Sequence, residues 1–306
     1  MKLKILYLCY MSTPLIRENI GLKSRKFRNI VLPLFGKDKS IYCDYALWNA
    51  NFVDGFKQFS EFEFHVVSPH NGLKQDEYHF QNDNISYHIY KTDSNLLVDF
   101  CRSIIHYDKR TDFKRFRKKA KSIIDRIKPD LIIMCGAEQP MFSPVSWDLS
   151  GLPILILLET LANDPQLKTM LPGSNIYSYV ERKTFETMLY FGTVSDKYYH
   201  FAREYNTNAQ CLKARFTTHQ PILYPDTRKK YDFIFYASTI SKNKGIEDVL
   251  LAFNEVHEKY PHLVLNVCGK CSDDYLAYLK HLVTPLAQPN VIFSGFHTSI
   301  NDVHKL

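Results

Sequence analysis

The chain has 306 residues, enough for one large domain or two ordinary ones, and 45% of them are apolar, which is ample for a buried core. Its seven cysteines, an odd number placed mostly in predicted strands and helices, exclude a disulfide framework and favour a reducing cytoplasm, and no run approaches the roughly 20 apolar residues of a membrane span. The formal net charge of +7 is distributed unevenly along the chain.

Predicted strands and helices alternate through the first hundred residues. Leu3 to Tyr10 is predicted to be a buried strand, since Thr13-Pro14 ends the apolar run too early for a signal peptide. Met11 to Asp44 lacks clear periodicity, and a long loop in a compact domain is usually functional or disordered. Apolar periodicity then predicts a helix over 45–60, strands over 62–68 and 85–91, and a helix over 96–106. The alternating strand 85–91 is expected at an edge of the sheet.

Residues 109–128 form the most charged element of the chain. They hold ten Lys or Arg residues against two Asp, a net charge of +8 that exceeds the charge of the whole chain. An apolar stripe predicts one amphipathic helix; its members are Phe113, Phe116, Ala120, Ile123, Ile124 and Ile127. Such a helix is either a solvated face or a contact with an anionic membrane, worth about 1 kcal/mol per basic residue. No nucleic acid is expected as a partner, because no nucleic-acid-binding module accompanies the charge.

The segment that follows completes a first α/β domain. Strands are predicted over 131–135, 153–158, 191–194 and 210–214, and helices over 177–189 and 196–205. Ser195 is expected to cap the last of these helices. Residues 219–228, which contain two prolines, are the best candidate for a linker. We therefore predict an N-terminal, acceptor-side domain over 1–218 and the beginning of a second domain over 229–306.

Residues 230–296 follow the order strand, loop, helix, strand, helix, strand. The strands are predicted over 232–237, 262–268 and 290–293, with apolar residues at a period of 3.6 between them. This is the pattern of a parallel βαβ unit with right-handed crossovers. Ligands of such sheets bind beyond the carboxyl ends of the strands, so the loops after Tyr236 and Val267 are the candidate positions for a site.

Three segments of this region match a known family in order and spacing: Lys244-Gly245 with the helix 246–253 after it, the strand 265–269, and residues 290–296. They resemble the donor domain of family 4 retaining glycosyltransferases. The resemblance implies the GT-B fold, an α/β architecture in which two Rossmann-like domains with parallel sheets face each other across a cleft. With about 75 residues, against roughly 100–150 for a usual domain, the second domain would be incomplete and the chain truncated within it.

The resemblance also implies a reaction. Such an enzyme transfers a sugar, with retention, from a nucleotide diphosphate sugar to a hydroxyl acceptor, which we expect to be a glycan or a lipid-linked precursor in polysaccharide biosynthesis. It would be cytoplasmic, and peripheral at the inner face of the plasma membrane through 109–128. No metal or cofactor is expected besides the donor, since the chain has no Asp-x-Asp, and Cys268 and Cys271 lack the second pair of a zinc site.

Six residues are candidates for binding the donor. Lys244 would neutralise the diphosphate at a helix N-terminus, where the amide groups of Gly245 and the next residue attract anions. Ser238 and Thr239 would add hydroxyl groups. Gly269 and Lys270 occupy the loop on which the family places nucleotide contacts, and glycine lets a ligand approach the backbone closely. A solvated loop lysine is the alternative interpretation of Lys244.

Two features differ from the family pattern. Ser238 stands where the family has an arginine that binds the diphosphate together with the lysine, and the family's pair of glutamates seven residues apart would fall beyond Leu306. A second hypothesis therefore stays open: a catalytically impaired protein that binds sugar nucleotides or docks to membranes.

Two glutamates are candidates for catalysis. Glu159 follows a buried strand at a position where the family often has a histidine near the anomeric carbon of the sugar. A carboxylate there could orient an acceptor hydroxyl or stabilise an oxocarbenium-like transition state. Glu138 resembles an acidic position in the same region of the family. A helix cap or an ion-paired loop acid is the alternative interpretation of Glu159.

Overall fold

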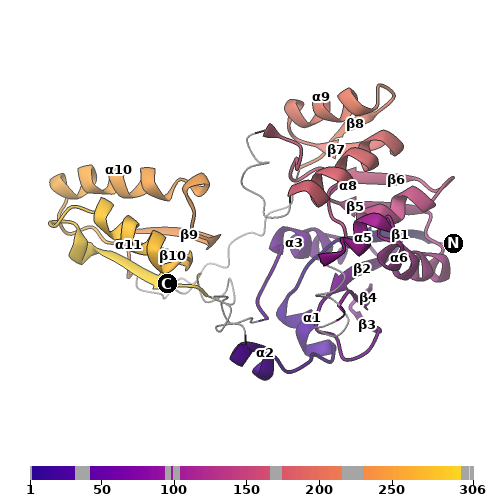
Figure 1. The fold of residues 1–306 in the computed structure, drawn as a ribbon, viewed down its shortest axis with the longest axis horizontal. Helices are drawn as coiled ribbons and strands as arrows, with labels where there is room; N and C mark the ends of the chain where they lie inside the picture. The colour runs from indigo at the N-terminus through magenta and orange to yellow at the C-terminus, as the bar shows by residue number, and fades with distance from the viewer. Residues whose placement is uncertain are drawn as a thin grey trace. The chain divides into compact units, whose positions relative to one another are not determined.

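The structure is a computed structural model that describes residues 2–31, 42–93, 98, 104–165, 174–215, 230–297 and 303. The chain divides into two compact units (Figure 1). The first comprises Met1–Ile41 and Tyr45–His219, and the second comprises Tyr42–Asp44 and Gln220–Leu306. The predicted linker 219–228 lies outside the described residues, as does most of the predicted helix 96–106.

The first unit is built on an eight-stranded sheet with the order β3-β4-β2-β1-β5-β6-β7-β8, in which only β3 is antiparallel to its neighbour. The strands are β1 (Leu3–Leu8), β2 (Phe62–His70), β3 (Glu77–Asn82), β4 (Ile85–Lys91), β5 (Leu131–Cys135), β6 (Ile154–Leu157), β7 (Tyr190–Thr193) and β8 (Gln210–Lys213). The central strands are buried on both faces, as parallel strands between helices are.

Helices cover both faces of this sheet. They are α1 (Pro14–Asn19), α3 (Leu47–Phe56), α6 (Lys114–Ile127), α8 (Ser174–Thr187), α9 (Asp196–Tyr205) and the 3-10 helix η2 (Ser143–Asp148). The unit also contains the short helices α2 (Lys26–Val31) and α5 (Tyr107–Arg110). Side chains of β1 alternate between two cores. Leu6 and Leu8 join the core formed with α6, α8 and α9. Ile5 and Tyr7 join the core formed with α1 and α3.

The second unit is a three-stranded parallel sheet with the order β11-β10-β9. Its elements are β9 (Phe233–Thr239), η3 (Lys242–Lys244), α10 (Ile246–Lys259), β10 (Leu265–Lys270), α11 (Asp273–Leu282), η4 (Gln288–Asn290) and β11 (Val291–Gly295). Both helices contribute to one core with the sheet. Asn254 joins them, donating to the carbonyl of Leu282 over 2.8 Å and accepting from the amide of Thr284 over 3.0 Å. The predicted βαβ pattern is confirmed.

Several local predictions were wrong. The strand 85–91 is not at the edge, because β3 pairs with it in a hairpin whose turn includes Asp83 at φ 56°. The stretch from Met11 to Asp44 contains α1, which Thr13 caps by accepting from the amide of Ile16, and α2. The predicted N-cap position of Ser195 on α9 is confirmed, although its side chain makes no capping hydrogen bond.

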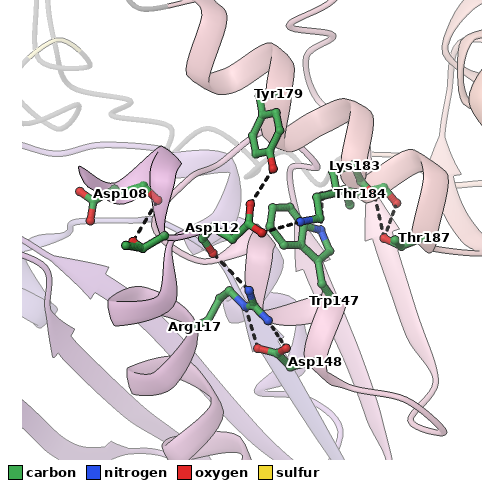
Figure 2. Close-up of polar contacts among 10 residues, drawn as sticks. Asp108, Asp112, Arg117, Trp147, Asp148, Tyr179, Lys183, Thr184 and Thr187 are labelled. Carbon is green, nitrogen blue, oxygen red and sulfur yellow. Dashed lines mark hydrogen bonds and ion pairs between the residues drawn. The ribbon is translucent and has the colours of Figure 1, made fainter. Parts of the chain in front are cut away.

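The predicted helix 109–128 is two helices, because the backbone turns left-handed at Asp112 (φ 50°) and Phe113 (φ 58°). The side chain of Asp112 accepts hydrogen bonds from the Tyr179 hydroxyl (2.6 Å) and the Lys183 amine (3.0 Å), both on α8 (Figure 2). Arg117 forms an ion pair with Asp148 of η2. These contacts with distant parts of the chain stabilise the break between α5 and α6, which the local sequence pattern does not predict.

We expect Asp112→Ala to destabilise the first unit by about 1–2 kcal/mol, because it leaves two donors of α8 without their acceptor and places alanine in a left-handed conformation that aspartate tolerates better. Urea unfolding measures the loss. Asp125→Ala is the matched control, since in the described chain Asp125 pairs with Lys121 one turn away on α6 and such exposed pairs contribute roughly 0.3–0.5 kcal/mol. Equal losses of unfolding free energy in the two variants would show that Asp112 does not stabilise the break between α5 and α6.

Candidate functional site

The sheet of the first unit reverses its direction of growth at β1. Strand β1 pairs with β2 on one side and with β5 on the other, both in parallel. Connections therefore leave the neighbouring ends of β1 and β5 toward opposite faces, which opens a crevice at their carboxyl ends, the usual ligand position in such sheets. A pocket of about 280 Å³ lies there. Its lining includes Tyr10 after β1, Cys135 and Glu138 at and after β5, and Glu159 after β6.

Glu159 lies in this pocket with its Oε1 atom 2.6 Å from the Cys135 Sγ atom, which donates to it. Burial raises the pKa of Glu159 to about 7; the charge of Glu138 adds to this, while hydrogen bonds from Cys135 and Trp48 oppose it. Burial also raises the pKa of the Cys135 thiol, so that it stays protonated and can donate. Near neutral pH, Glu159 is therefore present both as acid and as carboxylate and can give or take a proton.

Glu138 is the second carboxyl group of the pocket and is only 6% exposed. Its Oε1 atom accepts from the Gln139 side-chain amide over 2.7 Å, while its Oε2 atom is buried without a hydrogen-bond partner among the described residues. Burial raises the pKa of this carboxyl group, although hydrogen bonds from the backbone of Glu138, the Gln139 side chain and the backbone of Ala137 oppose the shift. The turn that presents it contains Gly136 at φ 99° and is fixed by Ser143, whose hydroxyl donates to the Gly136 carbonyl over 2.9 Å. The structure thus brings both predicted catalytic glutamates to one pocket.

Aromatic side chains form much of the remaining wall, and they were not predicted as site residues. Tyr10, Tyr45, Trp48 and Tyr177 all line the pocket. The rings of Tyr10 and Tyr45 are 4.6 Å apart. Asn49 holds this side in place by donating to the Tyr10 carbonyl over 3.1 Å. Trp48, which the periodicity of its helix places on the apolar side, is 40% exposed and lines the pocket instead.

Glu181 is a further buried carboxylate that was not predicted. It lies on α8, is fully buried, and accepts hydrogen bonds from the amides of Ala162 (2.6 Å) and Asn163 (2.8 Å). Burial raises its pKa to about 7, although these hydrogen bonds oppose the shift. It does not line the pocket. Its contribution is to fix the chain that leaves Glu159, so it supports the site without touching a ligand.

The predicted donor-binding residues of the second unit lie near the carboxyl ends of β9 and β10. Ser238 and Thr239 are exposed at the end of β9, and Lys270 is in register with Thr239. Gly269 has a φ of 151°, and a Cβ atom on it would lie 2.1 Å from the Ala237 carbonyl oxygen. The fold of the sheet therefore requires this glycine whether or not a ligand approaches.

Lys244 ends η3 and is exposed, and in the described part of the chain it makes no ion pair. Gly245 follows at φ 78° and is the N-cap residue of α10, where no side chain caps the first amides. Glu247 and Asp248 place negative charge in the first turn. The two negative carboxylates outweigh the roughly half positive charge of a helix N-terminus, so binding of an anion at this position depends on the positive charge of Lys244.

Comparison with known proteins concerns the fold. No protein-family profile and no curated protein matches the sequence. Sucrose-phosphate synthase from Thermosynechococcus elongatus matches with a TM-score of 0.57 at 12% identity, over 99% of this chain and 71% of that one. The chain has the GT-B fold. An E. coli trehalose-6-phosphate structure bound with UDP-2-fluoro glucose matches with a TM-score of 0.52 at 10% identity, over 97% and 74% of the two chains.

A third match is the complex of S. aureus MnaA with UDP, with a TM-score of 0.51 at 12% identity, over 100% of this chain and 71% of that one. The expected α/β class with two parallel sheets is confirmed. At these identities the likeness establishes the GT-B fold and not an activity. None of the described helices combines the length and hydropathy that a bilayer crossing requires.

We expect Glu159→Gln to stabilise the protein at about pH 8 and to change it little at about pH 4, because the raised pKa opposes folding where the unfolded chain is ionised. The loss of folding free energy grows as the pH rises from 4.5, the ordinary pKa of a glutamate, to about 7, the pKa of Glu159 in the folded protein. Above pH 7 the loss has its full size. One pKa unit is worth about 1.4 kcal/mol, and solvent in the open pocket reduces the total effect to about 1–2 kcal/mol.

Thermal unfolding of both proteins across this pH range measures the difference. Glu186→Gln on the exposed face of α8 is the control and should show no pH-dependent gain. A gain that is the same at both ends of the range would mean that Glu159 titrates as an ordinary surface carboxylate.

Proposed function

We propose that the protein is a glycosyltransferase that moves a sugar, with retention, from a nucleotide diphosphate sugar to a hydroxyl acceptor. The observation that carries the proposal is the pocket at the β1–β5 reversal of a GT-B fold, where the buried carboxyl group of Glu138 and the half-buried one of Glu159 meet aromatic walls. Two structures with this fold contain UDP or a UDP-sugar derivative, which supports a nucleotide sugar as donor. The resemblance to family 4 supports retention.

In this proposal Lys244 binds the donor diphosphate and stabilises the charge that develops on it as the glycosidic bond breaks. The uncapped amides of α10 add donors, and Ser238 and Thr239 add hydroxyl groups nearby. Gly269 and Lys270 contact the nucleotide from the neighbouring strand end. No metal is required, because the lysine and the amides supply the positive charge.

Glu159 and Glu138 act on the acceptor side. With a pKa of about 7, Glu159 can orient an acceptor hydroxyl as a hydrogen-bond acceptor and take up its proton at neutral pH. Glu138 holds a second hydroxyl through its buried Oε2 atom. The acceptor is a glycan or a lipid-linked precursor of a polysaccharide.

Serine at position 238 favours a second candidate function. Ser238 is exposed at the strand end where the family has an arginine, so one cation fewer faces the diphosphate. A protein that binds sugar nucleotides without turnover would show heat with UDP- or GDP-sugars in calorimetry but no sugar transfer. Transfer of labelled sugar to a polysaccharide or lipid-linked acceptor separates the two functions.

We expect Lys244→Ala to weaken binding of the UDP- or GDP-sugar at least tenfold, because about 1.4 kcal/mol or more is lost with the charge of the lysine that directly precedes the uncapped helix terminus. Isothermal titration measures the affinity. Lys242→Ala is the matched control: Lys242 lies in the same 3-10 helix, its side chain is 82% exposed, and it pairs with Glu247. Unchanged affinity in the Lys244 variant would remove this residue from the donor site.

We also propose that the protein contacts an anionic membrane through the amino-terminal part of 109–128. Five of the ten basic side chains in this segment are paired with carboxylates: Arg115, Arg117, Lys119, Lys121 and Arg126. Lys109, Arg110, Lys114 and Lys118 are exposed and have no such pair in the described chain. Exposed Ile104, Ile105 and Tyr107 lie directly before them, and cations beside exposed apolar residues suit an acidic lipid surface.

We expect charge reversal at Lys114 and Lys118 to lower binding to phosphatidylserine-containing vesicles at least tenfold, since each basic residue contributes about 1 kcal/mol near such a surface. Co-sedimentation with vesicles measures this. Reversal of Lys259 and Lys280, which are exposed in the second unit, changes the net charge equally and should have a smaller effect. Equal losses in the two double variants would indicate attraction by net charge and not by this surface.

A further inference from the structure

The pocket at the β1–β5 reversal has a distinct charge. Of the described residues that line it, none is Lys, Arg or His, and Glu138 and Glu159 are the only carboxylic acids. A ligand that carries phosphate or carboxylate would meet negative charge in a partly desolvated space, where like charges repel strongly and no cation compensates. The pocket therefore selects against anions.

The carboxyl group of Glu138 lacks a hydrogen-bond donor on one of its two oxygen atoms. Its Oε2 atom is buried and has no partner among the described residues, although its neighbour Oε1 is satisfied by Gln139. A buried acceptor without a donor costs about 1–3 kcal/mol, which a ligand can recover by donating a hydrogen bond. Hydroxyl and ammonium groups can donate, whereas a carboxylate or a fully ionised phosphate group has no proton to donate. This orphaned atom points to the kind of ligand.

The aromatic side chains that line the pocket indicate the shape of the ligand. Tyr10, Tyr45, Trp48 and Tyr177 combine flat apolar rings with polar edges, which fit a sugar ring with its C–H faces and its hydroxyl rim. Burial raises the pKa of Tyr45 to about 12, so its hydroxyl stays protonated and can donate. The volume of about 280 Å³ is at the lower end of the roughly 300–1,000 Å³ of small-molecule pockets, so the pocket accommodates about one sugar ring.

We propose that this pocket binds the reacting end of the acceptor as an uncharged sugar or an amino sugar, whose hydroxyl or ammonium group donates to Glu138 Oε2, and that it rejects phosphorylated sugars and uronic acids. This specificity rests on the proposed transferase function and narrows its acceptor. An anionic group elsewhere on a longer acceptor is compatible with it, because only the end that enters the pocket is selected.

The two tryptophans of the chain allow a direct test. Trp147 lies in η2 and does not line the pocket, so Trp147→Phe leaves Trp48 as the only tryptophan and its fluorescence reports on the pocket. The probes are glucose, glucosamine, glucose 6-phosphate and glucuronate, together with the matching galactose series. We expect at least one neutral or amino sugar to change the Trp48 emission saturably, and its anionic counterparts to bind at least tenfold more weakly.

Two results would overturn the proposal: anionic sugars that bind as tightly as their neutral counterparts, or no saturable binding by any neutral or amino sugar. Trp147 donates to the Thr184 hydroxyl over 3.2 Å, so the variant needs a check by thermal unfolding. If it is unfolded, saturation-transfer NMR with the same sugars on the unaltered full chain gives the same comparison.

Glu138→Gln tests the role of the carboxylate. Glutamine keeps the size of the side chain but removes its charge, so we expect the discrimination between neutral and anionic sugars to fall at least tenfold and the preference for amino sugars to disappear. Glu186→Gln, which removes an exposed carboxylate of α8, should leave both unchanged. Discrimination that persists in the Glu138 variant would exclude Glu138 as its source.

These measurements contain no nucleotide, so their outcome is independent of the donor site. Calorimetry with UDP- and GDP-sugars on the same protein tests the proposed function. Donor binding without sugar selectivity would leave the transferase proposal standing and remove the acceptor specificity. Sugar selectivity without donor binding would leave the selectivity of the pocket standing and remove the transferase proposal.

Discussion

The parallel pairing of β1 with strands on both sides is the constraint on which the candidate site depends. Because β2 and β5 flank β1, the chain must leave their carboxyl ends toward opposite faces of the sheet, and the space between those connections cannot be filled by either. The turn at Gly136 and the loop after β6 then bring Glu138 and Glu159 into that space. Glu181 fixes the second of these loops through two amides. The pocket is thus a product of topology, and its chemistry is a product of what the two loops carry.

Charge separates the two kinds of candidate site along the chain. The described lining of the pocket carries carboxyl groups without cations, and burial raises the pKa of both. The loop at Lys244 has the opposite character, an exposed lysine beside uncapped amides. A transferase needs both, since an acceptor hydroxyl must lose a proton and a diphosphate must leave with negative charge. Among the described residues, the pocket of the first unit supplies the carboxyl groups and the loop at Lys244 in the second unit supplies the cation.

Periodicity predicted the elements whose burial repeats along the chain. The strand 131–135 and the helix 196–205 have the bounds expected from their apolar patterns, and α10 begins where Lys244-Gly245 ends. The break at Asp112 could not be predicted, because the contacts that fix it come from α8, about 70 residues later in the sequence. The aromatic lining was missed for a related reason. An exposed Trp48 on an otherwise apolar helix side looks like core until the neighbouring loops are placed.

Strand β3 was missed because polar residues alternate with its aromatic ones, and this composition follows from its position. It is the antiparallel border of the sheet, where backbone groups on its outer side have no neighbouring strand. Tyr78 and Phe80 are half-buried, whereas His79 and Gln81 are exposed. Glu77 is held by Arg126 of α6, which anchors a charge at this border. Polar and charged edge strands disfavour β-sheet pairing between molecules, so the hairpin of β3 and β4 disfavours aggregation of the protein through this edge of the sheet.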